Sequence, residues 1–406
     1  MNNKKKLLFM LINMNVGGTE KALLNMISEI PKERYEITIL MLEEKGGFLD
    51  YIPSEVRVEY LKGYKDIKHM LNKPPQVLAL DFVRNKKIIN AVNLLFVYLL
   101  SKIKSDRSLF FKFIIKKFPV INEEYDLAVA YAGPMEFISF FVVHKIKAKK
   151  KIQWIHFDVS KIGFNSEFAS RIFKKFDKIF VVSEEGRNKL IQRIPDIKDR
   201  TEKFLNILSP DLITQMSDEG AGFEDNFEGI RILTVGRLSQ EKGQDLTIPV
   251  LARLKEEGYN IRWYCIGEGN ARSEYEKLVK YYGLENDYIL MGANANPYPH
   301  MKQCDIYVQP SRHEGYCITL SEARCFTNPI VSTNFTGAKE QVSHRQTGLI
   351  VGFDTQQIYI AIKELLDDEN LRNKIRSCLE KELVTDTKSE MDKLYKVLKA
   401  AEYDTR

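Results

Sequence analysis

Residues 306–323 read IYVQPSRHEGYCITLSEA. The segment opens with an apolar run, Ile306–Gln309, which predicts a buried strand, and Pro310 then ends that strand with a turn. The pattern predicts a helix from Thr319 to Cys325. A strand, a loop and a helix in this order form half of a βαβ unit, and such units build parallel sheets.

The same alternation of strand and helix patterns extends through the whole chain. In the first half, the predicted strands are Leu7–Ile12, Glu36–Leu42, Val56–Leu61, Asp126–Tyr131, Ile152–Phe157 and Lys178–Val182. In the second half, they are Arg231–Val235, Ile261–Ile266, Tyr288–Met291, Ile306–Gln309, Ile330–Thr333 and Leu349–Val351. Two such series predict an α/β protein with two doubly wound, parallel-sheet domains in tandem.

The length of the chain also favours two domains. The 406 residues exceed what one hydrophobic core usually organises. We expect an N-terminal domain over 1–205 and a C-terminal domain over 206–384, with the boundary between Asn206 and Gly229. The last helix, about 385–406, is a candidate to pack back on the first domain. A ligand site is expected in the cleft that faces the C-terminal ends of both sheets.

The composition is that of a folded, globular protein, with 44% hydrophobic and 11% aromatic residues. The 5 cysteines form no CxxC pair, and no histidine pair has zinc-site spacing. These features predict reduced thiols, a cytoplasmic location and no metal site. The apolar run Leu7–Ile12 is too short for a signal-peptide core, and no uncharged apolar stretch is long enough to span a bilayer.

The net charge is +6, and the basic residues crowd one part of the first half, from Lys86 to Lys151. They are interleaved with the apolar runs 94–100 and 110–115. This mixture is typical of helices that rest peripherally on an anionic membrane, here the inner face. Core-packing helices with solvated lysines explain it equally well, and both interpretations stay open. Binding to nucleic acid is not expected, because no recognition motif accompanies the charge.

Two glycines, Gly17 and Gly18, follow the first predicted strand and precede a helix. Glycine lets backbone approach a ligand closely, and Thr19 is predicted to cap the helix, whose positive end attracts an anion or a hydroxyl. A tight turn with a purely structural role is the alternative.

The strand that opens the second half ends at Gly236 and is followed by two cations, Arg237 and Lys242. Arginine offers a fixed fork of donors and lysine a compact point charge. The pair can therefore neutralise a pyrophosphate leaving group without a metal. Two solvated surface cations are the alternative.

Two carboxylates flank the loop after Pro310. Glu314 lies in that loop and Glu322 in the following helix, so they suit two different parts of one extended ligand, such as sugar and ribose hydroxyls. Between them, the backbone N–H groups of Ile318, Thr319 and Leu320 would point at a phosphate. Paired surface carboxylates without such a role are also common.

Taken together, the segments Gly17–Glu20, Val235–Gly243 and Pro310–Ala323 resemble, in order and spacing, the retaining GT-B glycosyltransferases of family four. The resemblance extends from the first strand to about Val351 and includes the strand segment Cys304–Ser311. It implies a GT-B fold of two Rossmann-like domains and a nucleotide-diphosphate sugar donor, expected to be a UDP-sugar. It also implies that no cofactor or metal is required.

The resemblance also implies roles for particular residues. Arg237 and Lys242 would bind the donor phosphates and Glu322 the ribose, whereas Glu314 would sit by the donor sugar. His156 matches the family's first-domain histidine near the reaction centre.

Three further positions match the family. Asn206 resembles the asparagine of the interdomain stretch, and Gly17 and Gly18 match the loop that donor and acceptor approach. One position departs from the family pattern: Tyr316-Cys317 stands where Phe-Gly is usual, which puts the identity of the sugar in doubt.

The resulting functional prediction is a retaining hexosyl- or N-acetylhexosaminyltransferase in bacterial cell-surface glycan or glycoconjugate synthesis. Its acceptor would be a saccharide, a lipid-linked saccharide, a wall or capsule polymer, or a protein. A nucleotide-sugar epimerase and a non-catalytic partner subunit on the same scaffold are the alternatives. The sequence leaves the donor sugar, the linkage, the acceptor and the oligomeric state open.

Overall fold

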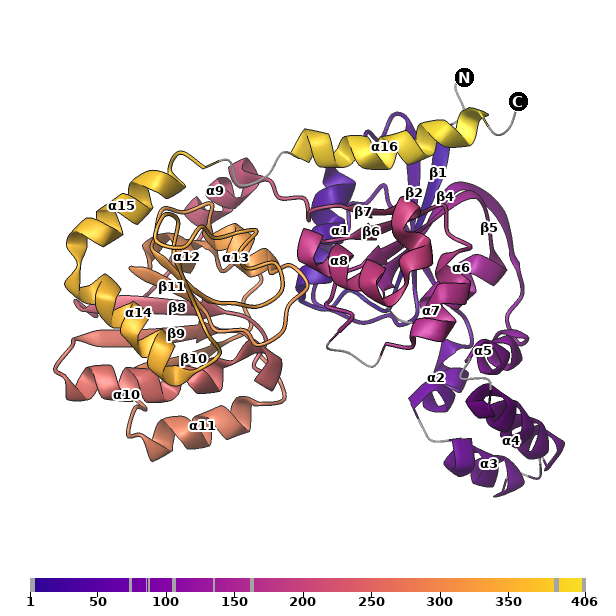
Figure 1. The fold of residues 1–406 in the computed structure, drawn as a ribbon, viewed down its shortest axis with the longest axis horizontal. Helices are drawn as coiled ribbons and strands as arrows, with labels where there is room; N and C mark the ends of the chain where they lie inside the picture. The colour runs from indigo at the N-terminus through magenta and orange to yellow at the C-terminus, as the bar shows by residue number, and fades with distance from the viewer. Residues whose placement is uncertain are drawn as a thin grey trace. The chain divides into compact units, whose positions relative to one another are not determined.

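A computed structural model describes residues 4–72, 75–84, 86, 88–103, 107–133, 136–160, 164–382 and 387–403 (Figure 1). The chain divides into two compact units. The first comprises residues 1–182, 187–204 and 391–406, and the second comprises residues 183–186 and 205–390.

The first unit is built on a parallel sheet of 7 strands, in the order β3-β2-β1-β4-β5-β6-β7. Its strands are β1 (Lys5–Leu11), β2 (Tyr35–Met41), β3 (Arg57–Tyr60), β4 (Ile121–Gly133), β5 (Ile146–Ile155), β6 (Lys178–Val181) and β7 (Thr201–Lys203). The helices along residues 1–204 are α1 (Gly18–Ser28), α2 (Tyr64–Asn72), α3 (Pro75–Arg84), α4 (Ile88–Ile103), α5 (Ser108–Ile115), α6 (Glu136–Lys145), α7 (Ser166–Phe173) and α8 (Glu184–Arg193), with 3₁₀ turns η1 (Leu49–Tyr51) and η2 (Pro195–Arg200).

The second unit is built on a parallel sheet of 6 strands, in the order β10-β9-β8-β11-β12-β13. Its strands are β8 (Ile230–Val235), β9 (Ile261–Ile266), β10 (Tyr288–Gly292), β11 (Ile306–Gln309), β12 (Ile330–Thr333) and β13 (Leu349–Val351). The later helices are α9 (Pro210–Asp218), α10 (Ile248–Glu256), α11 (Arg272–Tyr281), α12 (Tyr298–Gln303), α13 (Ile318–Ala323), α14 (Thr355–Asp367), α15 (Glu369–Leu379) and α16 (Thr387–Tyr403), with 3₁₀ turns η3 (Gln240–Lys242) and η4 (Gln244–Leu246).

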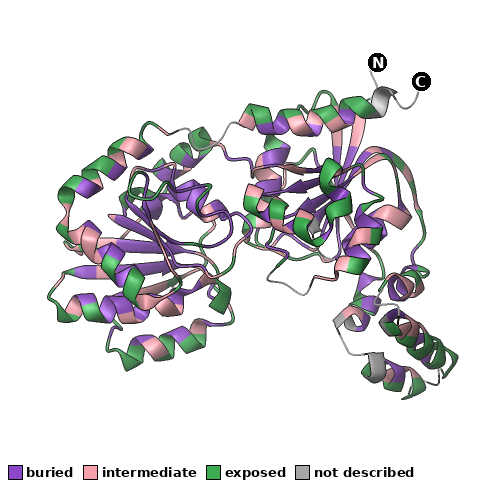
Figure 2. Ribbon diagram, viewed as in Figure 1, coloured by how far each residue is buried: buried purple, intermediate pink, exposed green. Residues whose placement is uncertain are grey.

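Both sheets form the cores of their units. Consecutive side chains of β1, from Leu7 to Met10, are fully buried, as are Ile232 and Leu233 of β8. Because successive strand residues point to opposite faces, such runs show that both faces of each sheet are covered (Figure 2). The predicted α/β class with two doubly wound parallel sheets is confirmed.

Each sheet has one point at which the strand order reverses direction. In the first unit it lies between β1 and β4, and in the second between β8 and β11. Chain segments that leave neighbouring strands at such a point diverge to opposite sides, which opens a crevice at the C-terminal edge of the sheet. The loops predicted to bind ligand leave from these strands.

The last helix, α16, packs with the first unit through an apolar face formed by Met391, Leu394 and Leu398, all buried. The ring of Tyr395 stacks on Tyr35, with 6.0 Å between ring centroids. The spacing of three and four residues between the buried positions is that of one helix face.

The structure differs from the sequence-based expectations in three places of the first unit. β5 begins at Ile146 and ends at Ile155, so the lysines over residues 147–151 lie on a strand rather than on a membrane-facing helix. β7 was not predicted. In α5, the apolar residues Phe110, Phe111, Ile114 and Ile115 are buried and therefore belong to the core.

Candidate functional site

The loops that follow β8 and β11 meet at the switch point of the second sheet. Gly243, between η3 and η4, has a φ of 72°. A Cβ at this position would overlap the carbonyl oxygen of Pro310, which directly follows β11. Only glycine combines this backbone conformation with so close an approach, so Gly243 holds the two loops together.

Arg312 ties the same two loops together through its side chain. Its guanidinium donates to both carboxylate oxygens of Asp245, at 2.8 and 2.6 Å, and to the carbonyl of Gln240, at 2.7 Å. Its backbone N–H donates to the carbonyl of Glu241, at 2.8 Å. A bidentate arginine–carboxylate pair has a fixed geometry, so this latch sets the position of one loop against the other. The latch was not predicted from the sequence.

Lys242 and Glu314 come together across the two loops. The Lys242 ammonium lies 2.6 Å from Glu314 Oε1, which also accepts a hydrogen bond from Ser311 Oγ at 2.8 Å. Burial disfavours the charged ammonium, but the Glu314 carboxylate outweighs it and raises the pKa of Lys242 above its usual value. Lys242 is therefore a cation at neutral pH.

Arg237 lies close to this pair and is exposed. Its positive charge acts to lower the pKa of Lys242, against the larger effect of Glu314. The buried side chain of Gln244 fixes the backbone at Gly236 and Arg237. Its Nε2 donates to the carbonyl of Arg237 at 2.9 Å and to the carbonyl of Gly236 at 3.3 Å. A Cβ on Gly236 would meet only atoms at 3.8 Å or beyond, among them the Lys242 side chain. Space for a ligand atom therefore remains above Gly236, beside Lys242.

A chain of buried hydrogen bonds supports Glu314 from the end of β11. Tyr307 Oη donates to Gln309 Oε1 at 2.8 Å, and Gln309 Nε2 donates to Ser311 Oγ at 2.8 Å. Thr319 Oγ1 also donates to Gln309 Oε1, at 3.2 Å. Each of these hydrogen bonds restricts the orientation of the next side chain, and Ser311 in turn donates to Glu314. The network therefore fixes the position of the Glu314 carboxylate.

The helix after this loop, α13, begins at Ile318, one residue earlier than predicted. The N–H groups of Ile318 and Thr319 lie in its first turn, where a helix supplies no backbone acceptor. The N–H of Leu320 interacts with the thiol of Cys317. Burial raises the pKa of that thiol to about 12, so it is neutral. Tyr316 and Cys317, the two residues that depart from the family pattern, are both buried.

Glu322 lies on α13 and is 1% exposed. Its Oε1 accepts a hydrogen bond from Tyr298 Oη at 2.9 Å. Burial, followed by the charge of Glu322, raises the pKa of Tyr298 far above its usual value, so the phenol stays a donor. Tyr298 is a second residue that was not predicted, because it lies 24 positions away from Glu322 in the sequence.

In the first unit, the glycine loop follows β1 at the switch point. Gly17 is the N-cap of α1, with extended backbone (φ −153°), and Gly18 begins the helix. No side chain caps α1, so the predicted cap by Thr19 is wrong. Gly46, with a φ of 132°, follows β2, and a Cβ there would overlap the Met14 backbone just before this loop. The contribution of Gly46 was not predicted.

His156 follows β5 directly and is 7% exposed. Its ring lies against Tyr131 of β4, with centroids 4.5 Å apart, and is nearly parallel to Trp154. Burial lowers the pKa of His156 to about 3, which keeps the imidazole neutral at pH 7. Among the described residues, its Nε2 has no hydrogen-bond partner. Asn206, after β7, is buried and belongs to the second unit.

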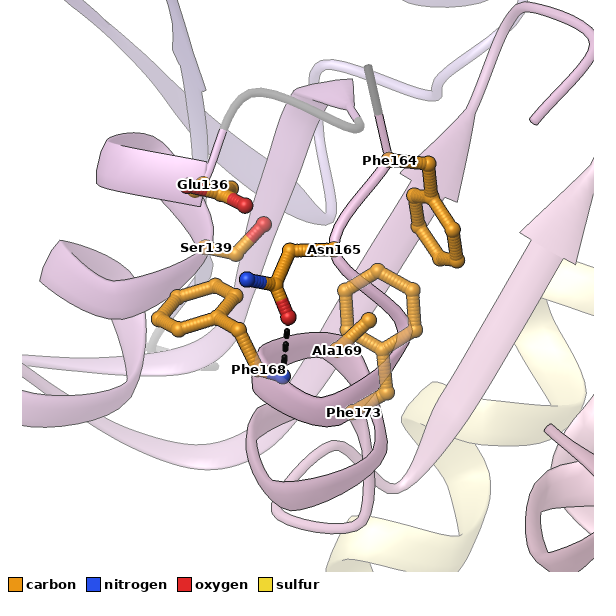
Figure 3. A pocket seen from close by; sticks show the side chains of 7 residues that line it. All are labelled: Glu136, Ser139, Phe164, Asn165, Phe168, Ala169 and Phe173. Atoms are coloured by element: carbon orange, nitrogen blue, oxygen red, sulfur yellow. Dashed lines mark hydrogen bonds between the residues drawn. The ribbon is translucent and has the colours of Figure 1, made fainter. Parts of the chain in front are cut away.

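A small pocket lies between α6 and α7 of the first unit (Figure 3). Asn165 Oδ1 accepts a hydrogen bond from the N–H of Phe168 at 2.9 Å, and thereby caps α7. Ser139 Oγ donates to Gln153 Oε1 at 2.6 Å. The remaining lining residues are Glu136, Phe164, Ala169 and Phe173.

The described residues contain no group of three or more His, Cys, Asp or Glu side chains that could hold a metal ion.

Residues 223–381 match the family model of glycosyl transferases group 1. This part of the chain, residues 223–381, is thus similar to the glycosyl transferases of group 1. The matched range contains the β8 and β11 loops and the whole of α13, so the family signature coincides with the switch point of the second sheet.

Curated proteins that are similar to parts of this chain include bacterial transferases. N-acetylgalactosamine-N,N'-diacetylbacillosaminyl-diphospho-undecaprenol 4-alpha-N-acetylgalactosaminyltransferase of Campylobacter jejuni is 30% identical over 210 residues, which cover 51% of this chain and 56% of that protein. Alpha-D-kanosaminyltransferase of Streptomyces kanamyceticus is 31% identical over 147 residues, 36% of this chain and 38% of that protein. The chain thus spans about half the length, or less, of these relatives.

Solved structures of the same fold cover nearly the whole chain. HepE of Anabaena, in complex with UDP and glucose, has a TM-score of 0.70 at 18% identity and covers 97% of this chain and 99% of that chain. A TarM variant of Staphylococcus aureus, crystallised with UDP, has a TM-score of 0.69 at 13% identity, with coverage of 97% and 99%. These structural similarities confirm the predicted GT-B fold.

Proposed function

We propose that this protein transfers a sugar from a nucleotide-diphosphate donor, a UDP-sugar, to an acceptor hydroxyl with retention of anomeric configuration. The observation that carries the proposal is the Lys242–Glu314 pair, which two latched loops hold at the switch point of the second sheet. Ligands of doubly wound sheets bind at such points.

The diphosphate of the donor would bind between Lys242 and Arg237. The ammonium of Lys242 keeps its charge in a partly buried position, where electrostatic interactions are stronger than in bulk water. Arg237, exposed beside it, adds the planar fork that suits phosphate oxygens. Because negative charge builds up on the diphosphate as the sugar departs, two fixed cations stabilise the transition state more than the ground state. In this proposal the two cations supply the charge that a metal ion would otherwise supply.

The two glutamates would hold hydroxyl groups of the donor. Glu314, fixed by Ser311 and Lys242, would lie by the sugar, and Glu322, fixed by Tyr298, by the ribose. The N–H groups of Ile318 and Thr319, with Leu320 behind them, would face the phosphates. Gly236 would let the donor approach the backbone, because its missing side chain leaves room beside Lys242.

The first unit would supply the acceptor side of the reaction. A neutral His156 can donate or accept one hydrogen bond without placing a positive charge next to the sugar. Gly17 and Gly18, which have no side chains, would let the acceptor approach the backbone closely. Asn206 would offer a buried amide for hydrogen bonds at the start of the second unit. The name of the Campylobacter jejuni relative, an N-acetylgalactosaminyltransferase acting on a diphospho-undecaprenol-linked saccharide, supports an N-acetylhexosaminyl donor and a lipid-linked acceptor, and the name of Staphylococcus aureus CapM supports a role in capsular polysaccharide synthesis.

The test is a turnover assay with a panel of UDP- and GDP-sugars, with and without candidate acceptors. We expect release of nucleoside diphosphate that depends on the acceptor, and a product whose anomeric configuration by NMR matches that of the donor. Lys242→Ala should reduce turnover at least about a hundredfold, the order seen when one transition-state donor is removed. Lys255→Ala is the matched control, because Lys255 pairs with Asp287 on the surface of the same unit.

Three results would contradict the proposal. Unchanged turnover in Lys242→Ala would remove the phosphate role. Conversion of the nucleotide sugar without any acceptor would indicate an epimerase. A product of inverted configuration would exclude retention.

A further inference from the structure

Helix α4 presents an apolar face to solvent. Its exposed side chains recur every three to four residues and lie on one side of the helix: Ile88, Ile89, Val92, Leu95, Phe96, Leu99 and Ile103. Ile89 and Ile103 are 77% and 78% exposed. The opposite side, with Ala91, Leu94 and Ser101, is buried. Since the buried side already packs in the protein, the exposed side is a second apolar face.

The neighbouring helix α3 extends this face. It packs on α4, and its side chains Val77, Leu80 and Val83 are also exposed. In Figure 1 the two helices lie side by side, and Figure 2 shows α4 mainly in the colour of exposed residues. Ten large apolar side chains on two adjacent helices form a patch of the kind that marks an interaction surface. We call these ten residues the α3–α4 face.

The sequence segment that carries the α3–α4 face is strongly positive. Residues 75–120 contain nine Lys and Arg against two Asp, a net charge of +7, whereas the whole chain carries +6. The remainder of the chain is therefore close to neutral. Exposed cations of the described residues in this segment are Arg84, Lys86, Arg107, Lys112, Lys116 and Lys117.

We propose that the α3–α4 face docks on an anionic lipid bilayer. Apolar side chains would enter the boundary between headgroups and acyl chains, and the surrounding cations would meet the anionic headgroups. The inference holds whether or not the protein transfers a sugar, because it uses no residue of the candidate site.

The dimensions of α4 favour a helix that lies along the surface. Its 16 residues span about 24 Å, less than the roughly 30 Å of a hydrocarbon core. Within the described part of the chain, no helix combines the length and the apolar character needed to cross a membrane.

Charge argues against a second copy of the chain as the occupant. A two-fold interface brings the same surface of both copies together, so two segments of +7 would face each other. Like charges in contact are unfavourable, whereas an anionic bilayer complements them.

The test is flotation of the full chain with vesicles of phosphatidylcholine alone, or of phosphatidylcholine with about 30–40% phosphatidylglycerol, so that the surface is strongly anionic. We expect binding to the anionic vesicles at low salt and weak binding to the neutral ones. The double variant Ile89→Gln/Phe96→Gln should reduce the partition coefficient roughly tenfold or more, because two large side chains no longer enter the bilayer. Ile360→Gln, an exposed isoleucine of α14, is the matched control and should bind as the unchanged protein does.

Thermal unfolding of each variant checks that the fold is kept, which is expected because the substituted side chains are exposed. Equal binding of the double variant and the control would overturn the proposal. So would binding to neither vesicle. Sedimentation velocity without lipid distinguishes self-association: a dimer of the unchanged protein that the double variant abolishes, together with no vesicle binding, would assign the face to a second copy instead.

Discussion

At the scale of single residues, burial and neighbouring charge decide the charge state of one candidate residue in each unit. His156 lies against Tyr131 and Trp154, and its burial lowers the pKa of the imidazole, which is therefore neutral at pH 7. Lys242 is also withdrawn from solvent, but the Glu314 carboxylate at 2.6 Å keeps it charged. Desolvation disfavours the charged form of both side chains. His156 is therefore neutral, whereas Lys242 stays a cation because of its carboxylate partner.

The buried His156 makes the stability of the protein dependent on pH. Its pKa of about 3 in the folded state lies below the unfolded value of 6.5. Between these values the unfolded chain binds a proton that the folded chain does not, so stability is lost as the pH falls. From pH 7 to pH 5, we expect this group alone to lower the free energy of unfolding by about 2 kcal/mol.

Urea unfolding at both pH values measures this loss. In His156→Gln the loss of unfolding free energy between pH 7 and pH 5 should be smaller by about 2 kcal/mol. An identical loss in His156→Gln and in the unchanged protein would show that His156 is protonated in the fold.

At the scale of elements, the contact between the β8 and β11 loops depends on Gly243. We predict that Gly243→Ala destabilises the protein and weakens UDP binding, because a Cβ overlaps the carbonyl of Pro310 as well as straining the backbone. Gly258→Ala is a matched control. Gly258 also has a positive φ, 90°, but no atom lies within 4 Å of the place that a Cβ would take there.

Gly258→Ala should therefore cost only the backbone strain, about 1 kcal/mol. Urea unfolding gives the difference between the two variants, and calorimetry gives their affinities for UDP. If both variants lost the same stability and bound UDP equally, the contact with Pro310 would have no role.

The strands of the second unit were predicted closely because each is a short apolar run bounded by glycine, proline or polar residues. β9, β11, β12 and β13 have the predicted bounds. β7, with the sequence Thr-Glu-Lys, lacks that signal, because it is a short edge strand that needs little apolar surface. The capping of α1 was predicted wrongly, because a glycine N-cap leaves no polar side chain to recognise.

Site residues that carry a motif could be placed on their elements from the sequence, but their partners could not. Arg312 and Asp245 are 67 positions apart, and Tyr298 and Glu322 are 24 apart. Such pairs are brought together by the order of strands in the sheet, which a single sequence does not encode in any local pattern. The functional roles of the site residues stay predictions.

At the scale of the whole molecule, the last helix, α16, packs with the first unit. α16 follows the second unit in sequence, yet its buried apolar residues Met391, Leu394 and Leu398 belong to the first. Leu394→Ala should therefore lower the free energy of unfolding by about 2–5 kcal/mol, the usual range for a buried leucine. Hydrogen exchange should locate the loss in the first unit, around β2 and α1. Lys396→Ala, an exposed change on the same helix, is the control. Loss of protection in the second unit alone would contradict this packing.

In both units a loop leaves a central strand at the point where the strand order of the parallel sheet reverses. The glycine loop after β1 and the Gly236–Lys242 loop after β8 occupy equivalent places in the two strand orders. In the second unit the loop carries two cations, and in the first it carries none between Val16 and Glu20. This asymmetry favours the second unit as the site of the anionic donor.

Calorimetric titration of UDP into the protein tests that placement most directly. We predict that UDP binds with a stoichiometry of one. Lys242→Ala should weaken the affinity roughly tenfold to a hundredfold, the equivalent of one charge-assisted hydrogen bond, whereas Lys255→Ala should not. Equal affinities in all three proteins, or no binding of UDP or GDP to the unchanged protein, would contradict the account.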